Sequence, residues 1–291
     1  MRLGHFYMED YMKIVVTGAT GKLGTALVQR GCLALKSDIT MQNDLTSEIH
    51  SIKPDILIHC AAITGVDYCE SHYKEAFEVN VRGTLNVFDA LPKTSTMIYI
   101  STDHIFPGEN WFDVGYSEVH KPQPVNYYGF TKWGGELAMQ KTSFNCRPII
   151  VRTSKSYDYE SMKPTIDALN KEEEIVLTDL IRRSFMYVPH FVGAILWLAN
   201  NTKEFPETKE TEIINIAGDC VFSYYRFWTI MKDALGLGGR LVPRRTKLRP
   251  EEASPRPFRA GLDVRYAKNM GVPIGSMQDA IKDLKEKMKN E

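Results

Sequence analysis

The sequence lacks several features that would each indicate a particular class of protein. Its 36 basic and 36 acidic residues leave no net charge, and no strongly basic block stands out, which argues against nucleic acid or an anionic membrane as the main partner. No apolar run approaches the ~20 residues of a membrane-spanning helix. Residues 1–11 lack the apolar centre of a signal peptide, so we expect Met12 to be the natural start and the protein to be cytoplasmic.

Cysteine is also scarce. The five cysteines are odd in number and scattered, mostly within apolar runs, at positions 32, 60, 69, 146 and 220. This pattern favours buried thiols in a reducing compartment over disulfides, and we expect no metal site. The chain is 43% hydrophobic and 25% charged, as in an ordinary globular protein, and its 291 residues suffice for one large α/β domain or one domain with a smaller lobe.

A short apolar strand near the start of the chain runs directly into a glycine-rich turn. Residues 14–24 read IVVTGATGKLG, with three glycines spaced Gly-x-x-Gly-x-x-Gly. Such glycines allow a tight turn, a close approach to a pyrophosphate, and packing of the new helix on the strand, while the free N–H groups of that helix face the phosphates. The segment therefore predicts a dinucleotide site. Its candidate contacts are Gly18, Thr20, Gly21, Lys22, Leu23 and Gly24.

Lys132 lies four positions after Tyr128, a helical spacing that places both side chains on one face. A tyrosine with its free pKa of ~10 is protonated at neutral pH, and an adjacent ammonium lowers that pKa. Such a tyrosine exchanges a proton with a carbonyl or alcohol oxygen while hydride moves to or from a nicotinamide. The pair is weak on its own, because about one or two such spacings arise by chance in this composition.

Two further apolar runs indicate buried parallel strands. One, residues 97–102, ends in the hydroxyls of Ser101 and Thr102, and the other, residues 55–62, ends in small residues. Ligands of open α/β sheets bind at the carboxyl ends of the strands. A hydroxyl there can hydrogen-bond a developing oxyanion, and small side chains admit a cofactor.

The end of the second strand bears on the choice between the two nicotinamide cofactors. An acid there would favour the ribose hydroxyls of NAD, whereas this chain has Lys36 and Ser37, with Asp38 just beyond. Because a lysine and a hydroxyl can hold a 2′-phosphate, we favour NADP(H), with NAD(H) as the alternative. A solvated surface charge is an equally open interpretation of Lys36.

Strands and helices alternate from residue 13 to about 154, which predicts a parallel, doubly wound sheet. Residues 236–261, rich in Gly, Pro and Arg, are the expected substrate-facing loops. The other elements expected after residue 154 are a helix over 161–170, a strand over 174–177, an apolar helix over 192–199 that returns to the sheet, a strand over 211–217, and two helices capped by Ser223 and Ser276.

Six phrases occur in the order TGATGKLG, HCAAITGVDYCES, NVRGT, YISTDHIFPG, NYYGFTKWGGE and VRTS. In them the chain resembles the extended short-chain dehydrogenase/reductases, and within these the dTDP-4-dehydrorhamnose reductase branch, densely over residues 12–154 and faintly as far as RPFRAGLD at 256–263. The positions that match the family's catalytic triad are Thr102, Tyr128 and Lys132. Those that match its cofactor site beyond the glycine loop are Asp38 and Ile39 beside the adenine, Ala61, Ala62, Thr64 and Asn80.

The resemblance implies a fold and a division of the chain. The fold class is α/β, a Rossmann-like doubly wound parallel sheet with a smaller C-terminal substrate-binding lobe. We assign residues 12–154 to the NAD(P)-binding domain, with 185–217 packing back onto it. Residues 155–184 and 218–291 then form the lobe, and the substrate lies in the cleft between the two parts.

The chain departs from the family's pattern in the substrate half. His104 stands where the reductases usually have tyrosine after Ser-Thr-Asp, and Lys155 stands where they have tryptophan after Arg-Thr-Ser. Both positions line the sugar-nucleotide pocket in the family. Asp179 is followed by leucine, where the family has Asp-Gln. The expected substrate contacts are Asp103, His104, Lys155 and Arg256, with Arg259 a further candidate for the substrate's phosphates.

The residues and the resemblance together predict an NAD(P)H-dependent oxidoreductase that reduces a keto group on a nucleotide-linked sugar. Tyr128 is the acid/base, Lys132 holds the nicotinamide ribose, and Thr102 orients the carbonyl oxygen. Two alternatives stay open: a sugar-nucleotide epimerase, and a non-catalytic regulatory subunit resembling the β subunit of methionine adenosyltransferase, which also keeps a Tyr-x-x-x-Lys pair. The expected partner is a small nucleotide-sugar-like substrate, without nucleic acid or membrane, and a homodimer is one option for the assembly.

Overall fold

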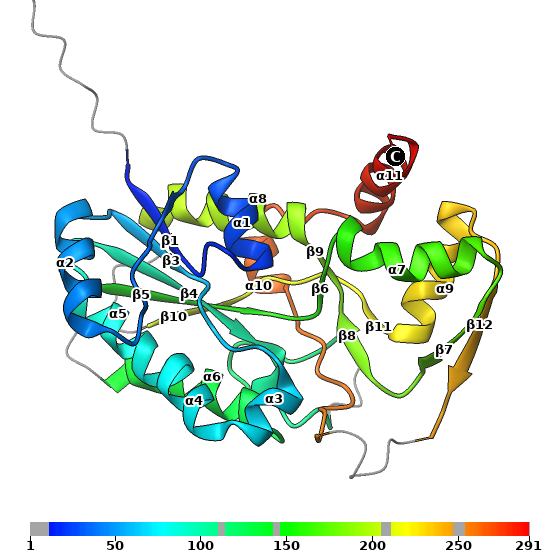
Figure 1. Cartoon of the computed structure of the whole chain (residues 1–291), viewed down its shortest axis with the longest axis horizontal. Coiled ribbons are helices and arrows are strands. Elements are labelled where there is room, and N and C mark those ends of the chain that lie inside the picture. The colour runs from blue at the N-terminus through cyan, green and yellow to red at the C-terminus, as the bar shows by residue number, and fades with distance from the viewer. Residues whose placement is uncertain (1–11, 110–113, 142–145, 205–210, 247–253, 291) are drawn as a thin grey trace, which may run out of the picture.

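The computed structural model describes residues 12–109, 114–141, 146–204, 211–246 and 254–290. Six parallel strands form a central sheet in the order β10-β5-β4-β3-β1-β2 (Figure 1). This is the parallel, doubly wound sheet expected from the sequence. Its strands are β1 (Ile14–Thr17), β2 (Leu33–Ala34), β3 (Ile56–His59), β4 (Thr96–Thr102), β5 (Arg147–Thr153) and β10 (Glu212–Asn215).

Helices cover both faces of the sheet because alternate residues of its apolar strands point to opposite sides. Val16 and Ile98 face a layer that contains α1, α8 and α10. Val15 and Met97 face the other layer, which contains α2, α5 and α6. These helices are α1 (Lys22–Val28), α2 (Gln42–Ile52), α5 (Thr84–Ala90), α6 (Tyr127–Lys141), α8 (Val188–Asn200) and α10 (Arg265–Asn269).

Short helical segments complete the sheet half of the molecule. A π-helical turn leads into α5, and a 3₁₀ turn follows β4 directly. These segments are α3 (Val66–Ser71), α4 (Tyr73–Phe77), η1 (Glu78–Gly83), η2 (Asp103–Ile105) and η3 (Thr202–Glu204).

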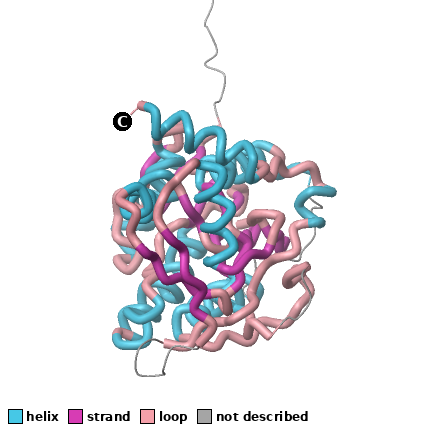
Figure 2. Tube along the Cα trace, turned by 90° about the vertical axis from the view of Figure 1, so that its right-hand side faces the viewer, coloured by secondary structure: helices cyan, strands magenta, loops and turns pink. Residues whose placement is uncertain are grey.

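The lobe lies beside the sheet, on the right of Figure 1 and towards the viewer in Figure 2, and it has its own apolar core. Three two-stranded sheets and three helices surround Phe185, Phe227 and Leu284. The lobe contains β6 (Ser156–Tyr157), α7 (Tyr159–Asn170), β7 (Glu174–Thr178), β8 (Arg182–Ser184), β9 (Met186–Tyr187), β11 (Val221–Ser223), α9 (Tyr224–Leu235), β12 (Arg240–Arg244) and α11 (Met277–Lys289).

The elements beyond residue 154 lie close to the expected ranges. α7 begins two residues before the expected start at Ser161, because Asp158 forms a capping box with that serine. Ser223 and Ser276 cap α9 and α11 as expected, each accepting a backbone N–H three residues on. α10 packs on the sheet through Ala267, although it lies within the range that the sequence assigns to the lobe.

The structure bears on two expectations from composition, which concern the cysteines and membrane-spanning helices. The five cysteines are free thiols, but Cys220 is exposed, because it lies in the bend before β11 and not in an apolar element. None of the helices in the described ranges has the length and apolar character that a bilayer crossing requires. Residues 1–11 and 247–253, which include part of the expected substrate-facing loops, lie outside the described residues.

Candidate active site

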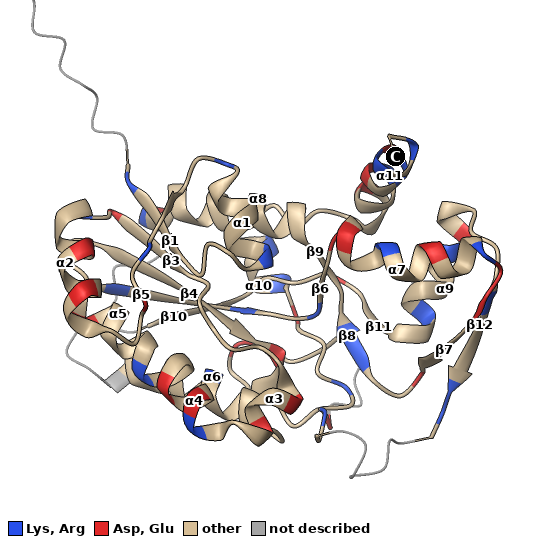
Figure 3. Cartoon of the chain, viewed as in Figure 1, with Lys and Arg blue, Asp and Glu red and all other residues tan. Residues whose placement is uncertain are grey.

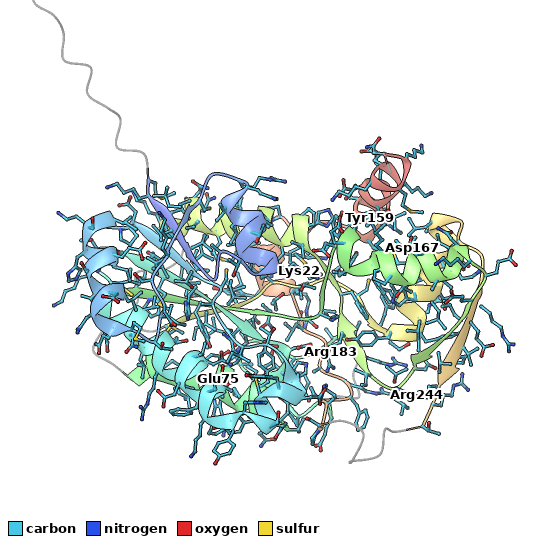
Figure 4. All side chains as sticks on the ribbon, viewed as in Figure 1. Lys22, Glu75, Tyr159, Asp167, Arg183 and Arg244 are labelled. Atoms are coloured by element: carbon cyan, nitrogen blue, oxygen red, sulfur yellow. The ribbon has the colours of Figure 1, made fainter. Side chains whose placement is uncertain are left out.

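A cleft of about 690 Å³ opens at the carboxyl ends of β3, β4 and β5 and reaches the lobe. Lys22, on the sheet side, and Arg183, on the lobe side, both line it and lie near the middle of the molecule in Figure 4. Its position is the crevice where open α/β sheets bind ligands. The predicted site residues that line the cleft are Gly18, Gly21, Lys22, Leu23, Ala62, Thr64, Thr102, Asp103, His104, Tyr128, Lys132, Lys155 and Arg256.

The glycine loop passes very close to the end of β3. Gly18 has φ +67°, and a Cβ there would lie 2.6 Å from the backbone N of Ala61. A Cβ on Gly24 would lie 2.1 Å from the carbonyl oxygen of Gly18, so any larger residue would push α1 off its strand. Gly24 and Ala61 therefore shape the loop without lining the cleft. The loop residues that line the cleft are Gly18, Gly21, Lys22 and Leu23.

The residues after β2 lie outside this cleft. The backbone N–H groups of Lys36 and Ser37 donate to the carboxylate of Glu48 on α2, at 3.0 and 2.7 Å. Asp38 accepts hydrogen bonds from Thr40, and the Ile39 side chain is buried in the core on that side of the sheet. The carboxylate of Glu48, which the sequence analysis did not identify, therefore lies where we expected the 2′-phosphate of NADP(H) to bind.

Asn80 and Thr20 are the two remaining predicted contacts outside the cleft. The Asn80 side chain is buried; its Oδ1 accepts the N–H of Ile63 and its Nδ2 donates to the carbonyl of Ile63 and to Thr131. Asn80 therefore fixes the chain after β3, which carries Ala62 and Thr64, to α6, which carries Tyr128. Thr20 is exposed within the glycine loop.

Thr102, Tyr128 and Lys132 meet at the floor of the cleft. Thr102 ends β4, and its hydroxyl accepts the backbone N–H of His104 at 3.2 Å. The first turns of α6 carry the other two side chains, and all three residues line the cleft. The Lys132 ammonium lies 3.9 Å from the centre of the Tyr99 ring, a cation–π contact inside the protein.

The protonation of this pair differs from the expectation. Burial raises the pKa of Tyr128 well above its usual value, and the nearby Thr102 hydroxyl opposes that rise without cancelling it. Burial also lowers the pKa of Lys132 to about 7, although the Glu136 charge partly counters this. Desolvation thus outweighs the attraction that the sequence suggested, because both groups are enclosed. Tyr128 is consequently a neutral phenol at neutral pH.

A buried ion pair between Arg152 and Glu136 holds the helix that carries Tyr128 and Lys132. Arg152 on β5 forms two hydrogen bonds to the carboxylate of Glu136 on α6, at 3.1 and 2.8 Å. Ser101 donates to the same carboxylate at 2.5 Å. Glu136 lies one turn beyond Lys132, so α6 presents Tyr128, Lys132 and Glu136 on one face. This arrangement fixes α6 against β4 and β5.

Asp103 is a buried carboxylate that joins the sheet to the lobe. Ser154, at the end of β5, donates to it at 2.5 Å, and the Arg183 Nε of β8 lies 3.3 Å away. Burial raises the pKa of Asp103, while Arg183 and the hydrogen bonds lower it. Because Asp103 follows Thr102 directly, this pair fixes the position of the lobe relative to the triad.

His104 lies beside Tyr128, with the two rings edge to face at 5.4 Å. The Asn126 amide accepts the N–H of Gly129 and donates to the carbonyl of Pro255, so its nitrogen faces Nδ1 of His104 at 3.1 Å. Nδ1 is therefore an acceptor, and the ring proton is on Nε2. Burial, followed by the charges of Arg183 and Arg256, lowers the pKa of His104 to about 3, so this residue is neutral in the cleft.

Arg256 crosses from the lobe to the sheet half. Its Nη2 lies 2.8 Å from the carboxylate of Asp67 on α3, and its Nη1 donates to the carbonyl of Ser254. Arg256 thus forms part of the rim of the cleft. Arg259, the other arginine considered for the substrate's phosphates, does not line the cleft; its backbone pairs with Gly108.

Sequence reasoning missed several residues that build the cleft. Arg183 and Tyr224 line it from the lobe, and Ser154, Asn126 and Glu136 orient its groups. Glu136 was detectable as the next helical step after Tyr128 and Lys132. Arg183 had no local signal, because its partner Asp103 is distant in sequence. Within the described residues, no group of three or more His, Cys, Asp or Glu is arranged to hold a metal ion.

Comparisons with known proteins agree on one family. The model of the RmlD substrate binding domain matches residues 12–290. Methionine adenosyltransferase 2 subunit beta of Danio rerio is 33% identical over 94% of this chain and 90% of its own length. A dTDP-4-dehydrorhamnose reductase of Aggregatibacter actinomycetemcomitans is 34% identical over 50% of this chain and 52% of its own.

A solved structure is similar over nearly the whole chain. The dTDP-4-dehydrorhamnose reductase of Bacillus anthracis, in complex with NADP, superposes with a TM-score of 0.81 at 26% identity. The superposition covers 94% of this chain and 98% of that one. The similarity therefore includes both the sheet and the lobe.

Proposed function

The chain belongs to the family of the RmlD substrate binding domain, and on that premise we propose that it is an NADPH-dependent reductase of a keto group on a nucleotide-linked sugar. It is thus an oxidoreductase of the extended short-chain dehydrogenase/reductase type, with NADH as the alternative cofactor. The observation that carries the proposal is the meeting of Thr102, Tyr128 and Lys132 in the cleft that the glycine loop enters. A hydroxyl, a neutral phenol and an ammonium in that arrangement suit carbonyl reduction.

The residues of the cleft fit a nicotinamide dinucleotide. Gly21 lines the cleft without a side chain, next to the left-handed turn at Gly18, so the backbone is open to a diphosphate. Lys132 has no carboxylate within ion-pair distance among the described residues, which leaves its donors for ribose hydroxyls. Ala62 and Thr64 would line the same half of the cofactor site, as small side chains after β3.

The proton is delivered by Tyr128. A reduced nicotinamide, when bound, supplies the hydride that the carbonyl carbon receives. As charge develops on the carbonyl oxygen, the Tyr128 phenol donates its proton, and Thr102 orients that oxygen through its hydroxyl. The elevated pKa of Tyr128 keeps this proton available across the physiological pH range. Lys132 then stabilises the phenolate that remains.

The direct test is an assay of NADPH oxidation with purified protein and a panel of nucleotide-linked keto sugars, dTDP-4-dehydrorhamnose included. We expect at least one sugar to be reduced with kcat/KM of about 10⁴ M⁻¹s⁻¹ or more. Binding of NADPH without turnover of any sugar in the panel would count against a reductase. A sugar that is isomerised without net loss of NADPH would indicate an epimerase instead.

A regulatory role is the second candidate, and the full-length similarity to methionine adenosyltransferase 2 subunit beta favours it. In that case the cleft would bind a dinucleotide as a structural ligand, and the partner would be another protein. The two functions are separated by adding the purified chain to a methionine adenosyltransferase catalytic subunit from the same source. Co-elution of the two, together with a changed rate of the catalytic subunit and no NADPH oxidation, would establish the regulatory role.

The division of labour along the chain is part of the proposal. Residues 12–154 and 185–217 would bind the cofactor, whereas 155–184 and 218–291 would bind the sugar, apart from α10, which packs on the sheet, and β9, which pairs with β6 in the lobe. We place the reaction in the cytoplasm, where free thiols persist, and we propose a homodimer. Cell fractionation and light scattering test these two points.

A further inference from the structure

The cleft concentrates positive charge in a protein that has no net charge. Its basic side chains come from the glycine loop, α6, the end of β5, β8 and the rim (Figure 3 shows basic positions on α1 and β8). Asp103 is the acid among the described residues that line it. A cleft lined by one sign of charge raises the local concentration of ligands of the opposite sign. The basic residues are Lys22, Lys132, Lys155, Arg183 and Arg256.

Three of these charges are already neutralised by partners. Arg183 is paired with Asp103 at 3.3 Å, Arg256 with Asp67 at 2.8 Å, and Lys22 with Asp158 at 3.4 Å. Lys132, the fourth, belongs to the triad and lies over the Tyr99 ring. Each of these four cations therefore has an assigned role or a counter-charge.

Lys155 is the exception. Among the described residues, no carboxylate lies within ion-pair distance of its ammonium, and the acid that attracts it, Asp103, is shared by Arg183 and Ser154. Partial desolvation in the cleft, Lys22 and Arg183 all lower the pKa of Lys155, because each disfavours its charged form, although the residue is still exposed to solvent. An anion bound among these cations would relieve that repulsion.

The position of Lys155 relates this charge to the reacting end of the cleft. Thr153 of β5 pairs in register with Thr102 of β4, so Lys155 follows the strand end that lies beside the triad. Its backbone carbonyl accepts the N–H of Met186 at 2.9 Å, which holds the segment in place. The rim arginine, Arg256, is fixed to α3 instead. Lys155 therefore lines the same cleft as the triad and follows the strand end that lies next to Thr102.

We propose that Lys155 binds a carboxylate on the sugar, so that the substrate is a nucleotide-linked keto sugar acid. This inference rests on the proposed reductase function. A sugar that carries only hydroxyls would offer this lysine neutral acceptors, whereas a carboxylate adds the attraction of an opposite charge to the hydrogen bond. The reaction itself leaves the carboxylate unchanged: the carbonyl carbon gains hydride from the nicotinamide, its oxygen gains the Tyr128 proton, and an alcohol forms.

The test compares three ligands by calorimetry, with the protein saturated with NADP⁺: dTDP-glucuronic acid, dTDP-glucose and dTDP. The first two differ only in the carboxylate. We expect the acid to bind about ten- to a hundredfold more tightly than the neutral sugar, and the difference to shrink when NaCl rises from 50 to 500 mM. Lys155→Gln should abolish the preference and leave dTDP-glucose and dTDP within about twofold of their original affinities.

Two variants act as controls. Lys155→Arg keeps the charge and should keep most of the preference. Lys171→Gln removes an exposed lysine at the end of α7, outside the cleft, and should change nothing. Thermal melts confirm that each variant is folded.

Other outcomes overturn the inference in distinguishable ways. Equal binding of both sugars by the original protein would refute the carboxylate preference while the reductase proposal stands. If Lys155→Gln weakens dTDP as much as the acid, the lysine binds the diphosphate; if it weakens NADP⁺, the lysine binds the cofactor. Failure of all three ligands to bind, with NADP⁺ bound, would reject the nucleotide-sugar function and this inference together.

Discussion

The charged side chains on the two sides of the cleft differ in how deeply they are buried and how they are paired. On the sheet side, the charged groups behind the triad are deeply buried: Glu136 is held by Arg152 and Ser101, and Lys132 lies over an aromatic ring. On the lobe side and the rim, cations outnumber acids, and Arg256 depends on the exposed Asp67. The sheet side is thus arranged before any ligand arrives, whereas the lobe side carries charge that an anionic ligand would complete.

The contrast suggests that the sheet side of the cleft carries out the reaction and that the lobe side selects the substrate. A triad that moves a proton needs fixed geometry, which buried pairs and short hydrogen bonds provide. A subsite that selects a substrate needs groups whose interactions are completed by the ligand, and Lys155 is such a group. Changes on the sheet side should therefore impair turnover and folding, and changes on the lobe side should alter selectivity.

The largest expected effect is that of Tyr128→Phe, which removes the proton donor and leaves the ring. We expect kcat to fall about 10²- to 10⁴-fold while the Kd for NADPH changes less than about twofold. Lys132→Ala should impair both quantities, because we propose that Lys132 also binds the nicotinamide ribose. NADPH oxidation and NADPH fluorescence titrations measure the two effects. Normal turnover by Tyr128→Phe would show that this tyrosine is not the proton donor. The sheet side of the cleft would then not be the catalytic side.

Glu136→Gln is expected to lower the free energy of unfolding by about 3–5 kcal/mol, because it leaves the buried Arg152 without its counter-charge. Urea denaturation measures the loss. The matched control is Glu78→Gln, which breaks an exposed pair with Arg82 and should have almost no effect. Equal effects of the two variants would show that the sheet side is not specially pre-arranged.

The third prediction concerns pH. Lys132 loses its proton as pH rises through about 7, so NADPH, which would bind the charged form, should bind about tenfold more weakly at pH 8.5 than at 6.5. Lys132→Arg, which stays charged, should flatten this dependence, and Lys155→Gln should retain it. His104, with a pKa of about 3, does not titrate in this range. If the Kd for NADPH does not change with pH in the unmodified protein, the charge of Lys132 does not contribute to cofactor binding.

The smallest expected effect is at the end of β2. Lys36→Gln should weaken NADPH about fivefold and leave NADH unchanged, because only NADPH carries the 2′-phosphate. Glu48→Gln should strengthen NADPH by a similar factor, since Glu48 now holds the backbone N–H groups of Lys36 and Ser37. Parallel titrations with NADPH and NADH give the ratio of the two Kd values for each variant. A loss of NADH affinity in either variant would point to a structural role.

The sequence determined the elements and the chemistry that depend on local order. The glycine spacing, the apolar strands and the Tyr128–Lys132 step are short-range patterns, and each is governed by interactions within a few residues. The caps at Ser223 and Ser276 could be predicted for the same reason. These patterns sufficed for the doubly wound sheet and for the presence of a nicotinamide-type site.

The tertiary structure alone decided protonation and charge partners. The pKa of Tyr128 rises because the folded chain removes water from it, and sequence spacing carries no information about desolvation. Asp103 and Arg183, Arg256 and Asp67, and Glu48 and the Lys36 backbone meet across long sequence separations. The uncompensated charge of Lys155 is a property of those pairings, because it is known only once every neighbouring carboxylate has been assigned to another cation.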